Sequence, residues 1–227
     1  MKERRTFLTH LNFGFTSLAA LAVGSAVTAQ AKSPASAQWE PARHEKDDWL
    51  DKPSVKHRLV FDTINFTGFG EALAFAANYI RVNGSDYGLQ ISDLAVVIVA
   101  RNRSTPFAYT DAIWAKYGSA ITSFAGFEDP KTKRPPTTNV YSSDDYGNLL
   151  PSRGMSLGFL AKQGVQFAVC SVATRNLAGA IATAISGNAD TINTELTTNL
   201  VTNSRMVPAG IVAVSRAQER GYTLVTV

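Results

Sequence analysis

Apolar strand patterns alternate with helical patterns along residues 57–227, and this alternation constrains the fold more than any other feature of the sequence. Residues 94–100 are apolar throughout, as expected of a strand that is buried on both faces. Residues 68–84 carry apolar side chains at helical spacing and end at an Asn-Gly pair. Strands that alternate with helices predict a parallel sheet covered by helices on both faces. The chain is therefore expected to form an α/β three-layer sandwich.

The same pattern gives the expected extent of each element. The expected strands are residues 57–63, 94–100, 165–170, 204–207 and 222–227. The expected helices are residues 68–84, 105–118, 155–163, 174–186, 190–201 and 208–221. The helix at 105–118 is predicted to begin with Thr105 as N-cap and Pro106 in its first turn, and Gly118 is expected to follow its end. Residues 119–152 are rich in Pro, Asp, Ser and Thr, and so long a connection is typical of lids, binding loops and subunit contacts.

The start of the chain predicts export. Residues 1–31 combine a charged head containing Arg4-Arg5, an apolar middle and a small-x-small end, as a secretory signal peptide does. The Arg-Arg-x-Phe-Leu stretch resembles the twin-arginine signal, which predicts a periplasmic or otherwise extracytoplasmic protein. The apolar run is too short for a membrane span, so no stable span is expected after processing. An ordinary Sec signal or an uncleaved anchor is the alternative.

Residues 32–56 are expected to be a linker before the α/β domain of residues 57–227. This charged segment is either disordered or a strap that lies on a neighbouring surface through Trp39 and Trp49. The signal peptide supplies +2 of the formal net charge of +4, so the remaining chain is only mildly basic. No stretch combines Lys and Arg with interleaved aromatic residues, which argues against nucleic acid as a partner.

Polar residues stand at the ends of three of the expected strands, at the edge of a parallel sheet where ligands usually bind. Asp62 and Thr63 are at the end of the first strand. Cys170, the single cysteine, ends the third strand just before a helix that carries Thr174 and Arg175. Arg101 and Arg103 follow the second strand. A thiolate is a nucleophile that helix N-termini and nearby cations favour, so these residues predict a site for a thiolate, a persulfide or an anionic sulfur compound. The alternative is that Cys170 is the last core residue of a buried strand.

Other motifs give weaker predictions. Residues 154–158 match Gly-x-Ser-x-Gly, the motif of a serine hydrolase. Such an enzyme needs a strand before the serine and a histidine after it in the chain. Here a polar loop precedes Gly154, and His44 and His57 both lie upstream. Ser156 is therefore predicted to be a helix N-cap. Residues 68–73 resemble half of a dinucleotide fingerprint without its third glycine. One cysteine and the upstream His44 and His57 do not make a zinc site, and neither a metal nor another cofactor is indicated.

The segment Cys170-Ser171-Val172-Ala173-Thr174-Arg175 resembles the Cys-x-x-Ala-x-Arg segment of the DsrE/DsrF-like sulfur-relay proteins. Residues 207–227 resemble the C-terminal end of that family, and residues 56–63 and 93–118 resemble an exported branch of it. The resemblance covers residues 56–118 and 153–227. It implies a five-stranded, mostly parallel sheet, and trimers or hexamers.

The resemblance also implies that Cys170 accepts and passes sulfur as a persulfide, with a donor or acceptor protein or a small anionic sulfur compound as partner. Arg175, Arg101, Arg103 and Thr174 are then expected to stabilise the anion. The alternative hypothesis is a non-catalytic, oligomeric binding or assembly module in which Cys170 is structural. Accessibility of the thiol in the folded protein separates the two hypotheses.

Overall fold

A computed structural model describes residues 39–227, and residues 41–227 form one compact unit. The expected signal peptide, residues 1–31, lies outside the described residues. Within residues 39–227, none of the helices has both the length and the apolar character that crossing a membrane requires.

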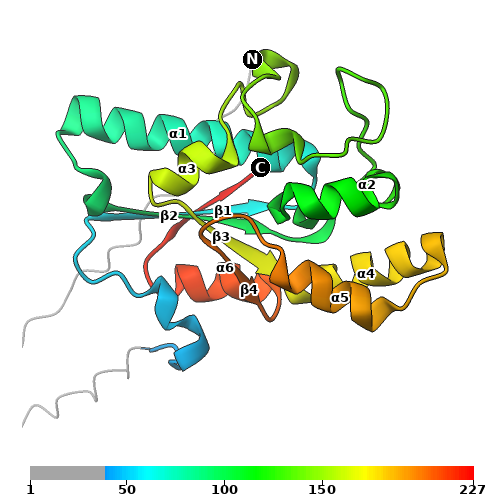
Figure 1. Ribbon diagram of the computed structural model, residues 1–227. Helices are drawn as coiled ribbons and strands as arrows, with labels where there is room; N and C mark the ends of the chain where they lie inside the picture. The colour runs from blue at the N-terminus through cyan, green and yellow to red at the C-terminus, as the bar shows by residue number, and fades with distance from the viewer. Residues whose placement is uncertain (1–38) are drawn as a thin grey trace, which may run out of the picture. The chain divides into compact units, whose positions relative to one another are not determined.

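A parallel sheet runs through the compact unit, as the alternating pattern predicts (Figure 1). Its five strands lie in the order β4-β3-β2-β1-β5, and every neighbouring pair is parallel. The strands are β1 (His57–Thr63), β2 (Leu94–Ala100), β3 (Gln166–Cys170), β4 (Ser204–Val207) and β5 (Thr223–Thr226). The α/β fold class and the five-stranded sheet are therefore confirmed.

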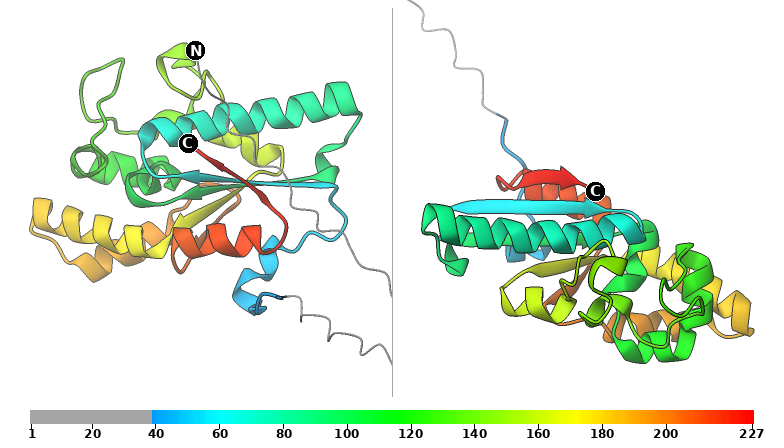
Figure 2. Two further views of the ribbon diagram at one scale, coloured as in Figure 1. Left: turned by 180° about the vertical axis from the view of Figure 1, so that it is seen from behind. Right: turned by 90° about the horizontal axis from the view of Figure 1, so that it is seen from above.

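Helices cover both faces of the sheet, and Figure 2 shows α1 and α6 on opposite sides of it. Helices α1 to α5 bury their apolar side chains in the larger core cluster, whereas α6 packs in a smaller cluster on the other face. Within residues 39–227 the α-helices are α1 (Phe66–Tyr87), α2 (Asp111–Ala125), α3 (Leu157–Lys162), α4 (Ser171–Ile185), α5 (Ala189–Thr198) and α6 (Gly210–Gln218).

Alternate residues of each central strand enter the two clusters. In β2, Val96 and Ile98 face the larger cluster, while Val97 and Val99 face α6. Successive side chains of a strand point to opposite faces, so a strand covered on both faces must be apolar at every position. This is why the continuous apolar run at 94–100 predicts its strand so well.

The helix predicted at 105–118 is wrong in its position. Residues Asn102–Ala108 form a 3₁₀ helix (η3), and α2 continues through Gly118 to a left-handed cap at Gly126. The Thr105 hydroxyl donates to the carbonyl of Ala100 instead of capping α2. Gly118 lies inside α2, and it must be glycine because the Pro136 carbonyl occupies the place where a β-carbon would be. A close approach, rather than a helix end, accounts for this glycine.

The connection between α2 and α3 is packed into the larger core cluster. It contains two short 3₁₀ helices, η4 (Val140–Ser142) and η5 (Gly147–Leu149). Tyr141 is fully buried, and its hydroxyl donates to the Phe66 carbonyl at 2.9 Å. The Asn139 amide donates to the carbonyls of Phe107 (2.8 Å) and Tyr109 (2.9 Å). These buried anchors attach the connection to α1 and η3.

The segment before β1 lies against α6. Its 3₁₀ helix η1 (Glu45–Leu50) buries Leu50 completely in the α6 cluster. The Tyr222 hydroxyl donates to the Leu50 carbonyl at 2.9 Å, and Asp51 forms an ion pair with Arg220 at 3.2 Å. Trp49 lies under the guanidinium of Arg205, 4.7 Å from ring centroid to the guanidinium carbon. Residues 41–56 thus form a strap over the face that α6 covers only in part, whereas Trp39 is exposed.

Candidate functional site

The sheet has a topological switch point at the ends of β3 and β4, because the chain leaves these two neighbouring strands toward opposite faces of the sheet. After β3 the chain enters α4, which belongs to the larger cluster, and after β4 it enters α6 on the other face. Cys170 ends β3 and is paired with Val207, which ends β4. Open parallel sheets bind ligands beyond the carboxyl ends of their strands at such a switch point. The topology therefore places Cys170 where a ligand site is expected.

Cys170 is the last residue of a strand and also the N-cap of a helix. Its sulfur accepts a hydrogen bond from the backbone N–H of Ala173 at 3.4 Å. Free N–H groups at a helix start carry partial positive charge, and this charge favours an anionic sulfur. The residue is only 6% exposed. The sulfur therefore has an anion-stabilising donor and a narrow approach from solvent.

Arg101 is the neighbour of Cys170 on the α6 face. The register pairs Ala100 with Val169, so the next residues, Arg101 and Cys170, are adjacent in the same row. Val99 and Ala168 face α6, and alternation along the strands turns residues 101 and 170 to that face as well. Two of the predicted site residues are therefore brought together.

A bidentate ion pair fixes the Arg101 guanidinium. Its Nε donates to Asp62 Oδ1 at 2.6 Å and its Nη2 donates to Asp62 Oδ2 at 2.8 Å. The Arg101 side chain is 27% exposed and that of Asp62 is 7% exposed. The hydrogen bonds from Arg101 to Asp62, the Asp62 charge and the nearby Cys170 sulfur raise the pKa of Arg101 despite its partial burial. Arg101 is thus a fixed cation whose head group is directed toward β1, whereas Cys170 lies on the other side of β2.

Thr174 lies beneath the cysteine turn and is fully buried. Its hydroxyl donates to the Cys170 carbonyl at 2.9 Å and lies 2.7 Å from the hydroxyl of Tyr109. Burial raises the pKa of Tyr109, so this phenol stays protonated over the ordinary pH range. Both hydroxyls are committed to holding the turn that presents Cys170, and Tyr109 also accepts from Asn139 through its carbonyl.

The other two predicted arginines lie apart from this pair. Arg103 is exposed, and its Nη1 lies near Gly126 at the C-terminal end of α2, where a cation faces free helix carbonyls favourably. Arg175 is exposed on α4 and forms no ion pair or side-chain hydrogen bond with any residue of 39–227. The sulfur contact that the sequence suggested for Arg103 and Arg175 is thus not part of the described geometry.

Sequence reasoning placed Asp62 at this edge of the sheet but did not identify it as the partner of Arg101, and it missed Tyr109. Asp62 stands at the end of β1, and a lone carboxylate two strands away from a cysteine gives little signal. Tyr109 comes from a segment far away from Cys170 in the chain. An acidic and a basic residue at the ends of neighbouring predicted strands, Asp62 and Arg101, is the one signal that was present.

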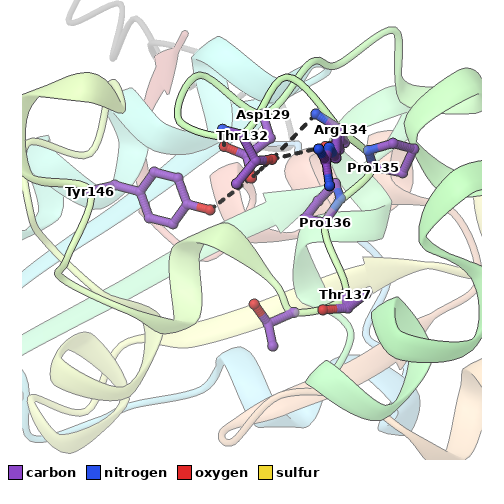
Figure 3. A pocket seen from close by; sticks show the side chains of 8 residues that line it. Asp129, Thr132, Arg134, Pro135, Pro136, Thr137 and Tyr146 are labelled. Carbon is purple, nitrogen blue, oxygen red and sulfur yellow. Dashed lines mark hydrogen bonds between the residues drawn. The ribbon is translucent and has the colours of Figure 1, made fainter.

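Away from Cys170, a pocket lies within the connection between α2 and α3, and Figure 3 shows its lining. This pocket of about 480 Å³ is lined by Asp129, Thr132, Arg134, Pro135, Pro136, Thr137, Thr138 and Tyr146. Asp129 is buried and accepts hydrogen bonds from the N–H of Lys131 (2.8 Å), the Thr132 hydroxyl (2.9 Å) and the Tyr146 hydroxyl (3.0 Å). The carboxylate thus serves the fold of the connection.

Two remaining sequence hypotheses can be placed. Ser156 is the N-cap of α3 and accepts from the Phe159 N–H at 3.3 Å, as predicted. Among the residues that the structure describes, no three His, Cys, Asp or Glu side chains are grouped so as to hold a metal ion.

Comparison with known proteins gives a structural likeness. No family model and no curated protein matches the chain. The chain is similar to a solved structure, that of the protein of unknown function MTH1491 from Methanobacterium thermoautotrophicum, with a TM-score of 0.38 and 15% sequence identity. The match covers 76% of this chain and 100% of that chain. The chemistry of the site therefore rests on the residues of this chain alone.

Proposed function

We propose that this protein is an exported, DsrE/DsrF-like sulfur carrier that holds sulfur as a persulfide on Cys170. The observation that supports this function is the placement of the Cys170 sulfur, which accepts from the first turn of α4 at a switch point of the sheet, with Arg101 at the end of the neighbouring strand. The helix N–H stabilises an anionic sulfur, whether thiolate or persulfide. The predicted signal peptide supports the extracytoplasmic location.

The chemistry balances without an external oxidant. The Cys170 thiolate attacks the outer sulfur of a donor such as thiosulfate, a new S–S bond forms, and sulfite leaves with the electron pair of the broken S–S bond. An acceptor thiolate then attacks the outer sulfur of the persulfide, and the Cys170 thiolate returns. The Ala173 N–H that the Cys170 sulfur accepts stabilises negative charge on this sulfur when it attacks and when it leaves.

The burial of Cys170 favours a second function. At 6% exposure the thiol also fits a structural role in a non-catalytic binding or assembly module, and the strap and the packed α2–α3 connection offer ordered surfaces for such contacts. A buried cysteine of this kind behaves as a small apolar side chain and is inert.

Intact-mass spectrometry separates these two functions. The protein is incubated with thiosulfate or polysulfide without reductant, and a gain of about 32 Da per sulfur atom is expected. The added mass should disappear with dithiothreitol and should not form in Cys170→Ser. If no mass is added, and the thiol alkylates only after denaturation, the carrier function is wrong and the structural role holds.

A further inference from the structure

Two buried hydroxyls connect the segment before α2 to the turn that carries Cys170. Tyr109 and Thr174 are both fully buried, and their hydroxyl oxygens lie 2.7 Å apart. The Thr174 hydroxyl donates to the Cys170 carbonyl at 2.9 Å. A threonine hydroxyl has one proton to donate, so Thr174 must accept from Tyr109. The hydrogen bonds therefore run in one direction, from Tyr109 through Thr174 to Cys170.

The backbone of Tyr109 is fixed as firmly as its hydroxyl. Its carbonyl accepts from the Asn139 amide at 2.9 Å, and Tyr109 forms an isolated antiparallel bridge with Leu200. Burial raises the pKa of Tyr109, and a negative charge on Cys170 raises it further. The phenol therefore remains a hydrogen-bond donor over the pH range in which thiols ionise. Tyr109 is thus a fixed donor to the turn.

The hydrogen bond to the Cys170 sulfur depends on the same turn. Ala173, whose N–H donates to the sulfur at 3.4 Å, directly precedes Thr174 in α4. Holding the Cys170 carbonyl against Thr174 therefore also fixes the distance between that N–H and the sulfur. Without the phenol, the Thr174 hydroxyl loses its donor inside the core, and hydrogen bonds in such a chain weaken together. A change at Tyr109 should thus reach the sulfur through Thr174.

We propose that Tyr109 is a positioning residue that sets the reactivity of the Cys170 thiol, because it holds, through Thr174, the turn whose N–H stabilises the anionic sulfur. This inference rests on the proposed function for its biological meaning, since a sulfur carrier needs a thiolate that attacks the donor. Its geometry and its test do not depend on sulfur transfer.

The pH dependence of alkylation tests the role of Tyr109. Cys170 of the folded protein is alkylated with iodoacetamide, a small neutral reagent, from about pH 6 to about pH 10. The midpoint of the pH–rate profile reports how well the thiolate is stabilised, whereas the plateau rate reports access to the sulfur. We expect Tyr109→Phe to move the midpoint upward by about 0.3 pH unit or more, as the loss of part of one hydrogen bond does. Thr174→Val should move it at least as far, and Thr174→Ser, which keeps the hydroxyl, should stay close to the wild type.

Two comparisons separate positioning from a general loss of stability. Tyr141→Phe is the matched control, because Tyr141 is as buried as Tyr109 and its hydroxyl also donates one hydrogen bond, to the Phe66 carbonyl at 2.9 Å. Its profile should equal that of the wild type. Tyr109→Phe combined with Thr174→Val should match Thr174→Val alone, since both substitutions break the same chain of hydrogen bonds. Every variant keeps the charged residues that adjoin the Cys170 turn, which are Arg101 and Arg103 after β2, Arg175 on α4 and Arg205 on β4.

Three results would overturn the inference: a wild-type midpoint in Tyr109→Phe, an equal shift in Tyr141→Phe, or a thiol that alkylates only after denaturation. Circular dichroism first shows which variants are folded. If Tyr109→Phe does not fold, Thr174→Val against Thr174→Ser decides, because both hydrogen bonds of the chain meet at Thr174.

Failure of this inference and failure of the proposed function are distinguishable. A protein that never gains sulfur mass yet shows the shifted midpoint in Tyr109→Phe retains the positioning role and loses only the carrier function. A protein that gains sulfur mass but has an unshifted midpoint in Tyr109→Phe retains the carrier function and loses the positioning role.

Discussion

At the scale of the residue, Cys170 combines two roles that are usually separate. It closes a buried strand, and its sulfur takes the place of the serine or aspartate oxygen that usually caps a helix. Because the same sulfur atom accepts the Ala173 N–H, a reagent that bonds to this sulfur also alters the cap of α4. Substitutions of Cys170 can measure how much this cap stabilises the fold.

Substitution of Cys170 should separate the cap from the chemistry. Serine keeps an acceptor for the Ala173 N–H, whereas alanine removes it, so we expect Cys170→Ala to unfold about 1 kcal/mol more easily than Cys170→Ser. Urea denaturation followed by circular dichroism, with equal m-values, measures the difference. Equal stability of the two variants would mean that the sulfur does not cap α4.

Much of the site could be predicted from the sequence at this scale, but its restraints could not. Cys170 and Arg101 were both expected beyond the ends of neighbouring strands, since a parallel sheet brings such residues to one edge. Asp62 and Tyr109 act through contacts between segments that are distant in the chain, and no local pattern encodes those contacts. Arg175 was expected at the sulfur because it is close in sequence, yet its side chain is exposed.

At the scale of the element, the sequence predicted strands better than helix ends. The strands predicted at 57–63, 94–100 and 204–207 match the observed strands at both ends. The second helix was misplaced because Thr105, Pro106 and Gly118 imitate a start and an end. Tertiary contacts to Ala100 and Pro136 account for two of these residues, and such contacts override local propensity.

The stability of the α2–α3 connection should depend on pH, because it contains Asp129 and Tyr146, whose pKa values are shifted in the folded protein. Burial alone raises the pKa of Asp129, but the hydrogen bonds from Lys131, Thr132 and Tyr146 outweigh it and hold the pKa below its ordinary value. Its stabilisation is therefore complete above the unfolded pKa and is lost as the pH falls through the lowered folded value. Burial and the bond to Asp129 raise the pKa of Tyr146 to about 12, so its stabilisation is lost as the pH rises from about 10 toward 12.

Thermal unfolding of wild type, Asp129→Asn and Tyr146→Phe across the pH range tests this expectation. The advantage of the wild type over Asp129→Asn should be constant near neutral pH and should shrink in acid. The advantage over Tyr146→Phe should shrink only in alkali. An advantage that does not vary with pH in either comparison would show that these groups titrate alike in the folded and unfolded chain.

At the scale of the whole molecule, the sheet is covered unequally. Five helices serve one face, while the other has α6 and the strap within the described residues. Leu50 of the strap is as buried as the central strand residues and completes the smaller cluster. The strap therefore belongs to the core of this unit and is more than a connection to the preceding residues.

Truncation of Leu50 tests this contribution. We expect Leu50→Ala to lower the free energy of unfolding by about 2 to 5 kcal/mol, as buried leucines do. The matched control is Leu149→Ala, because Leu149 is 57% exposed, and its effect should stay within about 0.5 kcal/mol. Urea denaturation measures both, and similar small effects would show that the strap adds little to the core.

The pairing of β1 with β5 has a consequence for synthesis of the chain. Within residues 39–227, β1 is the first strand to be synthesised and β5 is the last, yet they are neighbours in the sheet. Until β5 is made, β1 presents a row of unpaired amide and carbonyl groups at an open sheet edge, which can recruit other chains. Native structure thus completes late, through a contact of large sequence separation that is intrinsically slow to form. A nascent chain of this topology benefits from protection of that edge until β5 has been made.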